Sequence, residues 1–264
     1  MFGFHINKDK TTISKSIEYH HKKTKFECAA IFISNPRAHS KISEDDELKS
    51  TIEKLNLTII AHGSYCDVPW KNEKNMSFVL AELNMCHSYG IKGMVIHLSK
   101  SSIEEIKPAL VNLLSKTKCK LYLETPAINK SDYATPEQLL TLIKELDLYK
   151  DKLGICIDTA HIHISGVDLS SYKKAKAYFD KIEEIIKIYP DMFMLHLNDS
   201  TQELGKGRDQ HEALMKGKIW KGFKFEESGL CAIFEFIKRN NIITILERKE
   251  GLIDDFKLIN RYYI

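Results

Sequence analysis

The sequence lacks the features that would divide it into parts or attach it to a membrane. No low-complexity stretch or Gly/Pro/Ser-rich linker interrupts its 264 residues. No apolar run approaches the roughly 20 residues that a membrane-spanning helix needs, and the N-terminal segment lacks the long apolar stretch of a secretory signal. We therefore expect one globular domain over residues 1–264, of the size usual for a single α/β barrel, with no membrane contact.

Closely spaced cysteine pairs are also missing. The six cysteines are scattered along the chain without a CxxC motif, and several lie inside apolar segments. This distribution predicts free, buried thiols rather than disulfides, and a reducing compartment. We expect a cytoplasmic protein, with a nuclear or virion location left open.

Arginine is scarce. The chain has 39 lysines and arginines against 36 aspartates and glutamates, a formal net charge of +3, and only five of the cations are arginines. Lysine, isoleucine and asparagine are abundant together, and an AT-rich genome explains that bias as well as a nucleic-acid surface does. The lysine content alone is therefore weak evidence for DNA binding.

Short apolar segments rich in β-branched and aromatic residues alternate with helical patterns along the whole chain. The eight segments lie near residues 2–6, 26–34, 57–61, 93–98, 120–124, 153–158, 193–198 and 242–247. This alternation predicts a (β/α)8 barrel, a TIM barrel, with a doubly wound open sheet as the alternative. No GxGxxG motif follows the first segment, so a dinucleotide-binding fold has no support.

Nine side chains suited to bind metal ions follow these apolar segments. They are His62, His97, Glu124, Asp158, His161, His196, Asp209, His211 and Glu247. Because the C-terminal ends of parallel strands meet on one rim of a barrel, we expect these side chains to converge there. Five imidazoles and four carboxylates in one cleft are electrostatically unfavourable without cations. An imidazole-rich set of this kind favours zinc over magnesium.

Two of these positions form a DxxH pair, and two others form a DxH pair. Asp158 ends an apolar segment, and His161 follows one helical turn later; an alternative role for Asp158 is to cap that helix. Asp209 and His211 are two residues apart, so extended backbone can direct both side chains toward one ion. Each pair alone is weak evidence for a metal.

The other candidates stand at the ends of strands. Glu124 and Glu247 close apolar segments, where a buried carboxylate is costly unless it is paired or coordinated. A salt bridge with a neighbouring lysine or with Arg248 is the alternative. His5 ends the first segment, and we expect it to contact one of the metal-binding side chains rather than to bind a metal ion itself. We expect His163 to be packed or hydrogen-bonded. The remaining histidines, His20, His21, His39 and His87, are expected to be structural.

The order and spacing of these motifs resemble the endonuclease IV family of apurinic/apyrimidinic (AP) endonucleases. The matching pieces are HGSY, LET, GICIDTAH, HLNDS, DxH and ILE, and they extend over essentially the whole chain. The resemblance implies three zinc ions per chain, with Mn²⁺ an alternative at one site. It assigns His62, His97 and Glu124 to the first ion. It has Glu124 bridge to a second ion that Asp158, His196 and Glu247 also bind, and it gives His161, Asp209 and His211 to the third.

The same resemblance implies an activity in base excision repair. Members of the family hydrolyse the phosphodiester 5′ to an abasic site in double-stranded DNA and leave a 3′-hydroxyl and a 5′-deoxyribose phosphate. No Ser/His/Asp arrangement or phosphate-binding loop is evident, so we expect a metal-bound hydroxide as the nucleophile. Glu124, Asp158 and Glu247 are the expected catalytic residues. The resemblance places DNA contacts at Asn35, Arg37 and Tyr65, and we expect a monomer.

Two other functions are compatible with the sequence. A sugar-phosphate isomerase or epimerase with the same barrel assembles one or two metals from fewer ligands. The additional set of His161, Asp209 and His211 argues against that function. A non-catalytic DNA-binding barrel is the second alternative, and the presence of all nine candidate ligands argues against a site that has lost its chemistry.

Overall fold

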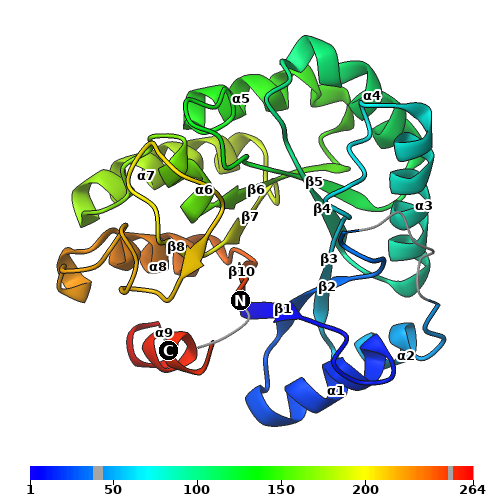
Figure 1. Ribbon diagram of the computed structural model, residues 1–264, viewed down its shortest axis with the longest axis horizontal. Coiled ribbons are helices and arrows are strands. Elements are labelled where there is room, and N and C mark those ends of the chain that lie inside the picture. The colour runs from blue at the N-terminus through cyan, green and yellow to red at the C-terminus, as the bar shows by residue number, and fades with distance from the viewer. Residues whose placement is uncertain (38–43, 249–251, 264) are drawn as a thin grey trace.

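The computed structural model describes residues 1–37, 44–248 and 252–263, so that His39 lies outside the described residues. Eight parallel strands alternate with helices. They are β1 (Phe2–Ile6), β2 (Cys28–Phe32), β3 (Thr58–His62), β4 (Gly93–His97), β5 (Lys120–Glu124), β6 (Leu153–Asp158), β7 (Phe193–His196) and β10 (Thr244–Leu246). They close into a barrel in the order β1-β10-β7-β6-β5-β4-β3-β2 (Figure 1). The predicted TIM barrel is confirmed, and the open sheet is excluded.

Helices form a ring outside the strands. They are α1 (Ile13–Thr24), α2 (Leu48–Leu55), α3 (Glu73–Tyr89), α4 (Ile103–Lys116), α5 (Pro136–Glu145), α6 (Thr159–Ile164), α7 (Tyr172–Ile188), α8 (Gly229–Asn240) and α9 (Leu252–Tyr262). Thr135 caps α5 as its sequence predicts, because its hydroxyl accepts the Gln138 N–H at 3.3 Å and Pro136 occupies the first turn. Two short 3-10 turns, η1 (Asp147–Tyr149) and η2 (Phe225–Glu227), complete the helical elements.

One element was not anticipated from the sequence. The connection between β7 and β10 contains a two-stranded hairpin, β8 (Asp199–Ser200) with β9 (His211–Glu212). Strands of two residues carry no periodicity that a sequence pattern can reveal. The hairpin matters because β9 contains His211.

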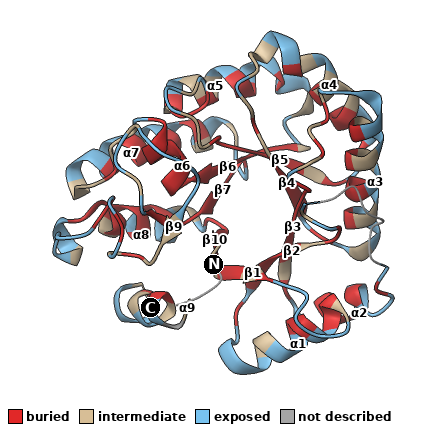
Figure 2. Cartoon of the chain, viewed as in Figure 1, coloured by how far each residue is buried: buried red, intermediate tan, exposed pale blue. Residues whose placement is uncertain are grey.

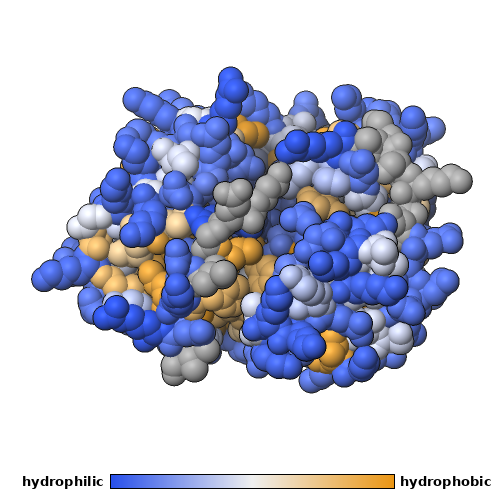
Figure 3. All heavy atoms as spheres, turned by 60° about the horizontal axis from the view of Figure 1, so that its bottom comes forward, coloured by the Kyte–Doolittle hydropathy of each residue, from blue (hydrophilic) through white to orange (hydrophobic). Residues whose placement is uncertain are grey.

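Burial follows the two layers of the fold. The strands are buried along most of their length, whereas the outer faces of the helices are exposed (Figure 2). The face seen in Figure 3 is mainly hydrophilic, with one group of hydrophobic side chains left of centre. All six cysteines are free thiols, and four of them are buried, as expected. Among the described residues, no helix is long and apolar enough to cross a membrane.

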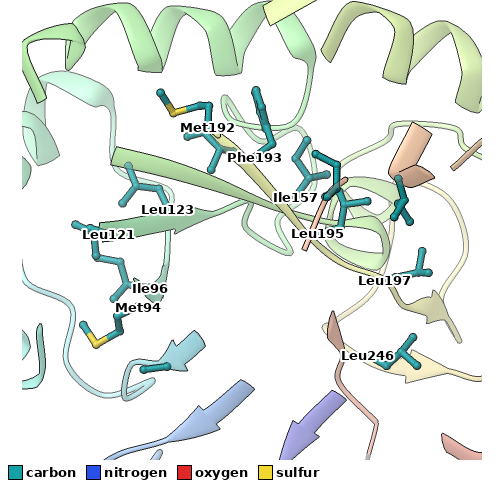
Figure 4. Close-up of a cluster of buried hydrophobic side chains, with 14 of the residues drawn as sticks. Met94, Ile96, Leu121, Leu123, Ile157, Met192, Phe193, Leu195, Leu197 and Leu246 are labelled. Carbon is teal, nitrogen blue, oxygen red and sulfur yellow. The ribbon is translucent and has the colours of Figure 1, made fainter. Parts of the chain in front are cut away.

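Side chains alternate along each strand between the helices and the barrel interior. Leu121 and Leu123 of β5 and Ile157 of β6 belong to the large core between the strands and the helices (Figure 4). Tyr122 and Cys156, one residue away, belong to a second cluster inside the barrel. This period of two governs the functional site, because the next inward position on each strand lies at the rim.

The ring of Tyr122 fills the barrel interior between two glycines. A Cβ at Gly93 would lie 2.5 Å from Cε2 of Tyr122, and a Cβ at Gly154 would lie 2.3 Å from Cδ1 of the same ring. No L side chain fits at either position unless the ring moves. The two glycines therefore make room for the aromatic ring on the intervening strand.

We expect Gly154→Ala to destabilise the protein because the added methyl group overlaps the Tyr122 ring. Overpacking of a filled core costs about 1–3 kcal/mol. Urea unfolding of chelator-treated protein, followed by circular dichroism, measures the loss. Tyr122→Leu introduced into the same variant should recover part of it. A G154A protein as stable as the parent would show that the ring does not fill this space.

Candidate metal centre

Five of the nine candidate ligands occupy the last inward-facing position of their strands, and a sixth, Glu247, directly follows β10. They are His62, His97, Glu124, Asp158, His196 and Glu247, and the residues two positions before them are Ile60, Val95, Tyr122, Cys156, Met194 and Ile245, all members of the interior cluster. The strand register places His97 beside Glu124 and Asp158 beside His196. The period of two thus turns all six side chains to the mouth of the barrel.

A cleft of about 550 Å³ opens at the C-terminal rim, and His97 and Glu247 of these six side chains line it. Its walls are His5, Asn7, Phe32, Tyr65, His97, His161, Asp209, His211, Glu212, Glu247 and Arg248. The cleft is polar at its base, where the histidines and carboxylates lie, and aromatic at one side.

The fully buried carboxylate of Glu124 lies at the centre of the cluster. Its Oε2 is 2.9 Å from Nε2 of His97 and 3.3 Å from Nε2 of His62. Its Oε1 is 3.0 Å from Nδ1 of His196. Ligand atoms of His62, His97 and Glu124 all lie within 4.8 Å of one another, so these three could hold one ion together.

Main-chain carbonyl groups orient two of the imidazoles. Nδ1 of His62 lies 2.8 Å from the Gly63 oxygen, and Nδ1 of His161 lies 2.8 Å from the Thr125 oxygen. A carbonyl oxygen only accepts, so Nδ1 carries a proton in both rings, and in the neutral form of either ring Nε2 presents its lone pair to the cluster. Both rings are therefore preset as metal ligands.

A second group joins Glu124, Asp158, His196 and Glu247, whose ligand atoms also lie within 4.8 Å of one another. Oε2 of Glu247 is 3.0 Å from Nδ1 of His196. Nδ1 of His5 is 4.0 Å from Oε1 of Glu247, which places His5 beside a candidate ligand as expected. Burial lowers the pKa of His5 to about 4, although Glu247 opposes the shift, so His5 is neutral at physiological pH.

Asn198 links the Asp158 carboxylate to the backbone of Glu247, and the sequence interpretation missed it. Its Nδ2 donates to Oδ2 of Asp158 at 2.7 Å, and its Oδ1 accepts the main-chain N–H of Glu247 at 3.1 Å. Asn198 is buried two residues after His196. An asparagine directly after a buried strand was the available signal, because such an amide needs several partners.

The third set comes from loops and from α6. Oδ1 of Asp209 is 3.2 Å from Nε2 of His161 and 2.9 Å from Nε2 of His211. Oδ2 of Asp158 is 3.6 Å from Nε2 of His211, and Asp158, His161 and His211 form one group within 4.8 Å. Asp158 thus lies close to the ligands of the third ion as well as to those of the second. The resemblance assigned it to the second ion alone. It also caps α6, since its Oδ1 accepts the His161 N–H at 2.9 Å.

His163 and Arg248 have structural partners. His163 is buried with its Nε2 3.1 Å from the Gln202 carbonyl oxygen, in agreement with a packed, hydrogen-bonded side chain. The Arg248 guanidinium pairs with Glu212 at 3.4 Å and with Asp255 at 3.2 Å.

The three expected DNA-contacting residues lie on the loops after β2 and β3. The Tyr65 ring is half exposed, and its centroid is 5.1 Å from that of His62 and 5.2 Å from that of His97. Asn35 and Arg37 are exposed, and Oδ1 of Asn35 accepts the Arg37 main-chain N–H at 3.0 Å. Tyr65 therefore borders the cluster directly, while Asn35 and Arg37 are part of the neighbouring loop.

Charge in the cluster is balanced by proton sharing when metal ions are absent. Burial opposes ionisation of Glu124, but His97 and His196 outweigh it and lower the pKa of Glu124 well below its usual value. Burial opposes protonation of His211, but Asp158 and Asp209 outweigh it and raise its pKa to about 9. Carboxylates thus raise histidine pKa values here, and cations would compete with those protons.

The donor set fits divalent metal ions. Nε2 of His161 and Nε2 of His211 are buried and have no aligned hydrogen-bond partner among the described residues, although carboxylate oxygens lie close to both. Imidazole nitrogen and carboxylate oxygen at such distances are the ligands that zinc binds. These nitrogen atoms have no aligned hydrogen bond with the nearby carboxylate oxygens, and a cation shared between them would give each atom a partner.

Comparison with known proteins agrees with this site. The family model described as a xylose isomerase-like TIM barrel matches residues 20–227. A protein of African swine fever virus (isolate Tick/South Africa/Pretoriuskop Pr4/1996) named "Probable AP endonuclease" is 41% identical over 238 residues, which cover 86% of this chain and 80% of the relative. The "Probable endonuclease 4" of Thermosipho melanesiensis is 30% identical over 217 residues, covering 74% of this chain and 76% of the relative.

Solved structures give the same result. The crystal structure of AsfvAP:AG matches with a TM-score of 0.90 and 34% identity, covering 100% of this chain and 99% of that chain. Endonuclease IV from Thermus thermophilus matches with a TM-score of 0.77 over 99% and 97% of the two chains, and at 22% identity supports the fold only. The chain belongs to the xylose isomerase-like TIM barrels and, among them, to the AP endonuclease (endonuclease IV) family. As a member of this family, it is a hydrolytic DNA-repair endonuclease.

Zinc binding should release protons from the cluster, because only neutral imidazoles coordinate a metal. The pKa values of His161 and His196 are raised well above normal, and that of His211 to about 9, so these rings hold protons at pH 7. We expect release of roughly two or more protons per chain at pH 7 and fewer at pH 9, with zinc affinity rising between them. Calorimetric titration in two buffers of different ionisation enthalpy measures the number. No release at pH 7 would contradict the proton-sharing cluster.

Proposed function

We propose that this cleft hydrolyses the phosphodiester 5′ to an abasic site in double-stranded DNA, leaving a 3′-hydroxyl and a 5′-deoxyribose phosphate. The observation that carries the proposal is the convergence of nine candidate ligands around the buried Glu124 carboxylate in a chain of the AP endonuclease family. The names of the relatives, AP endonuclease and endonuclease 4, support the substrate.

We further propose three zinc ions per chain, with Mn²⁺ an alternative at one site. His62, His97 and Glu124 would hold the first ion; Glu124, Asp158, His196 and Glu247 the second; His161, Asp209 and His211 the third, with Asp158 close to it. When bound, such ions activate water and offset the charge of phosphate oxygens. Four carboxylates balance only four of the six positive charges, which leaves the cleft attractive to a phosphodiester.

The residues of the chain fix the positions of the carboxylates and of the protons on the imidazoles. Glu124 can contact two ions because each of its oxygens faces a different histidine. The Asn198 amide holds the Asp158 carboxylate and the backbone of Glu247 in fixed positions, so that these two proposed catalytic residues keep one geometry. The carbonyl oxygens of Gly63 and Thr125 keep the Nδ1 protons of His62 and His161 on the side away from the substrate.

The third set of ligands distinguishes this proposal from a sugar isomerase or epimerase. A structure of L-ribulose 3-epimerase matches with a TM-score of 0.62 at 14% identity, a likeness of fold alone. Asp209 and His211 are brought to His161 by the connection between β7 and β10. A third ion at this position supports phosphodiester hydrolysis. Sugar isomerases and epimerases need only one or two ions.

The proposed partner is double-stranded DNA with abasic sites, bound by a monomer. Tyr65 is proposed to pack beside an extruded abasic sugar, since its ring is exposed next to His62 and His97. Arg37 is proposed to insert into the duplex or to contact its backbone. The six free thiols support a reducing compartment such as the cytoplasm.

We expect Glu124→Gln and Asp158→Asn each to abolish nicking of a duplex that contains one abasic analogue. Each change removes a ligand charge and little volume, so the fold should persist while the rate falls on the order of 10³-fold or more. Gel assays under single-turnover conditions, with an undamaged duplex in parallel, measure this loss. Glu53→Gln, an exposed change on α2, is the matched control. Near-normal cleavage with normal metal content would remove the assigned role.

Arg37→Ala should weaken binding to the abasic duplex more than binding to the intact duplex. A plain phosphate contact would instead lower both affinities equally and change the salt slope by about one unit. Titration of both duplexes at two salt concentrations separates these cases. Arg261→Ala, which removes an exposed arginine of α9, is the control. Equal losses on the two DNAs would leave Arg37 a general phosphate contact.

A further inference from the structure

Glu82 is a fully buried carboxylate outside the proposed metal cluster. It lies on α3 and is 0% exposed. The Ser34 hydroxyl donates a hydrogen bond to its Oε1. Ser34 follows β2 and begins the loop that carries Asn35 and Arg37, so Glu82 binds the base of one proposed DNA-contacting loop.

The same carboxylate also contacts the second loop. The main-chain N–H of Ser64 lies close enough to lower the pKa of Glu82. Its Oε2 is buried on the side of Gly63, where a Cβ would lie 3.8 Å from that oxygen and 3.0 Å from Cγ2 of Ile96. Gly63 and Ser64 lead directly into Tyr65. One side chain therefore touches the bases of both loops.

The two loops are joined to each other above Glu82. The Tyr65 N–H donates to the Pro36 carbonyl oxygen at 3.0 Å, and the Ser64 hydroxyl donates to the same oxygen at 3.5 Å. These contacts make the loops one unit, with Glu82 at its base. A displacement at Ser34 or Ser64 would therefore move Arg37 and Tyr65 together.

A carboxylate at this position is costly. Burial raises the pKa of Glu82 to about 7, the Ser34 hydroxyl lowers it, and the buried Asp67 nearby raises it further. An apolar side chain would avoid this cost but could not accept the hydrogen bond from Ser34. Buried polar groups of this kind can fix one arrangement of the parts that they join.

We propose that Glu82 is a positioning residue that holds residues 34–37 and 63–67 in the one arrangement that presents Arg37 and Tyr65 to DNA. It touches neither the substrate nor the metal cluster and acts through Ser34 and Ser64. The inference rests on the proposed function for its DNA part, whereas the hydrogen bond of Glu82 with Ser34 and its position against Gly63 stand independently.

Two variants test this in the full chain loaded with zinc. Glu82→Gln keeps the shape but removes an acceptor oxygen, and Ser34→Ala removes one hydrogen bond with little risk to folding. Glu73→Gln and Ser77→Ala are matched exposed changes on the same helix. Hydrogen exchange at the Tyr65 and Cys66 amides measures how firmly the loops are held. The Leu195 amide, which donates to the Ile243 oxygen in the barrel, is the internal reference.

We expect both variants to exchange at Tyr65 and Cys66 about 10-fold faster than the parent, with Leu195 unchanged. That factor corresponds to the loss of one hydrogen bond. The Kd and KM for a duplex with one abasic analogue should rise about 5- to 10-fold, while kcat and zinc content stay within about twofold of the parent. The two control variants should match the parent in every measurement.

Several results would overturn the inference. Unchanged exchange at Tyr65 and Cys66 in both variants would show that Glu82 does not hold the loops. Faster exchange with unchanged Kd and KM would show that the loop arrangement does not govern DNA binding. A loss confined to kcat together with lost zinc would place Glu82 in the metal centre instead. If the parent neither binds nor cuts the abasic duplex, the proposed function and the DNA part fail, while the exchange rates still decide whether Glu82 holds the loops.

Discussion

A buried carboxylate surrounded by imidazoles at the mouth of the barrel is the constraint on which the rest of the structure depends. Glu124 is fully buried, and His62, His97 and His196 all lie within 3.3 Å of its oxygens. Isolated, such a charge would be prohibitively costly in a protein interior. It is tolerated because neighbouring strands supply charge-compensating groups at the same height, and because that arrangement fits divalent cations.

Much of this arrangement could be predicted from the sequence, for a simple physical reason. Parallel strands buried on both faces appear as continuous apolar segments, and a polar side chain at the end of such a segment lies on the rim. Glu124 and Asp158 were found in this way, since each ends its strand in the structure. The spacing of two between Tyr122 and Glu124, or between Cys156 and Asp158, also fixes which face each side chain takes.

The parts that could not be predicted depend on main-chain atoms or on contacts distant in sequence. The carbonyl oxygens of Gly63 and Thr125 orient two imidazoles, and every residue has such an oxygen. Asn198 bonds to Asp158 across 40 positions, and only the closed barrel brings them together. Asp158 is a helix cap and a member of the cluster at once, although the sequence presented these roles as alternatives.

Carboxylates away from the cluster organise the loops of the same rim. Asp199 is buried and accepts main-chain N–H groups of Ser200, Gly217 and Ile219, closing the connection that carries Asp209 and His211. Asp255 of α9 accepts the Leu214 N–H and pairs with Arg248. With Glu82 below the loops after β2 and β3, these residues hold the rim loops against the barrel. The rigid barrel positions the strand-borne ligands, and the loops add the rest.

The central claim is that Glu124 and the eight candidate ligands around it form one metal centre. Anomalous diffraction from crystals grown with zinc, measured above and below the zinc absorption edge, tests it most directly. The account predicts three peaks, with two of them at bonding distance from the two oxygens of Glu124 and the third beside His161, Asp209 and His211. A map without peaks at these residues, or with peaks only at surface histidines such as His20, would contradict it.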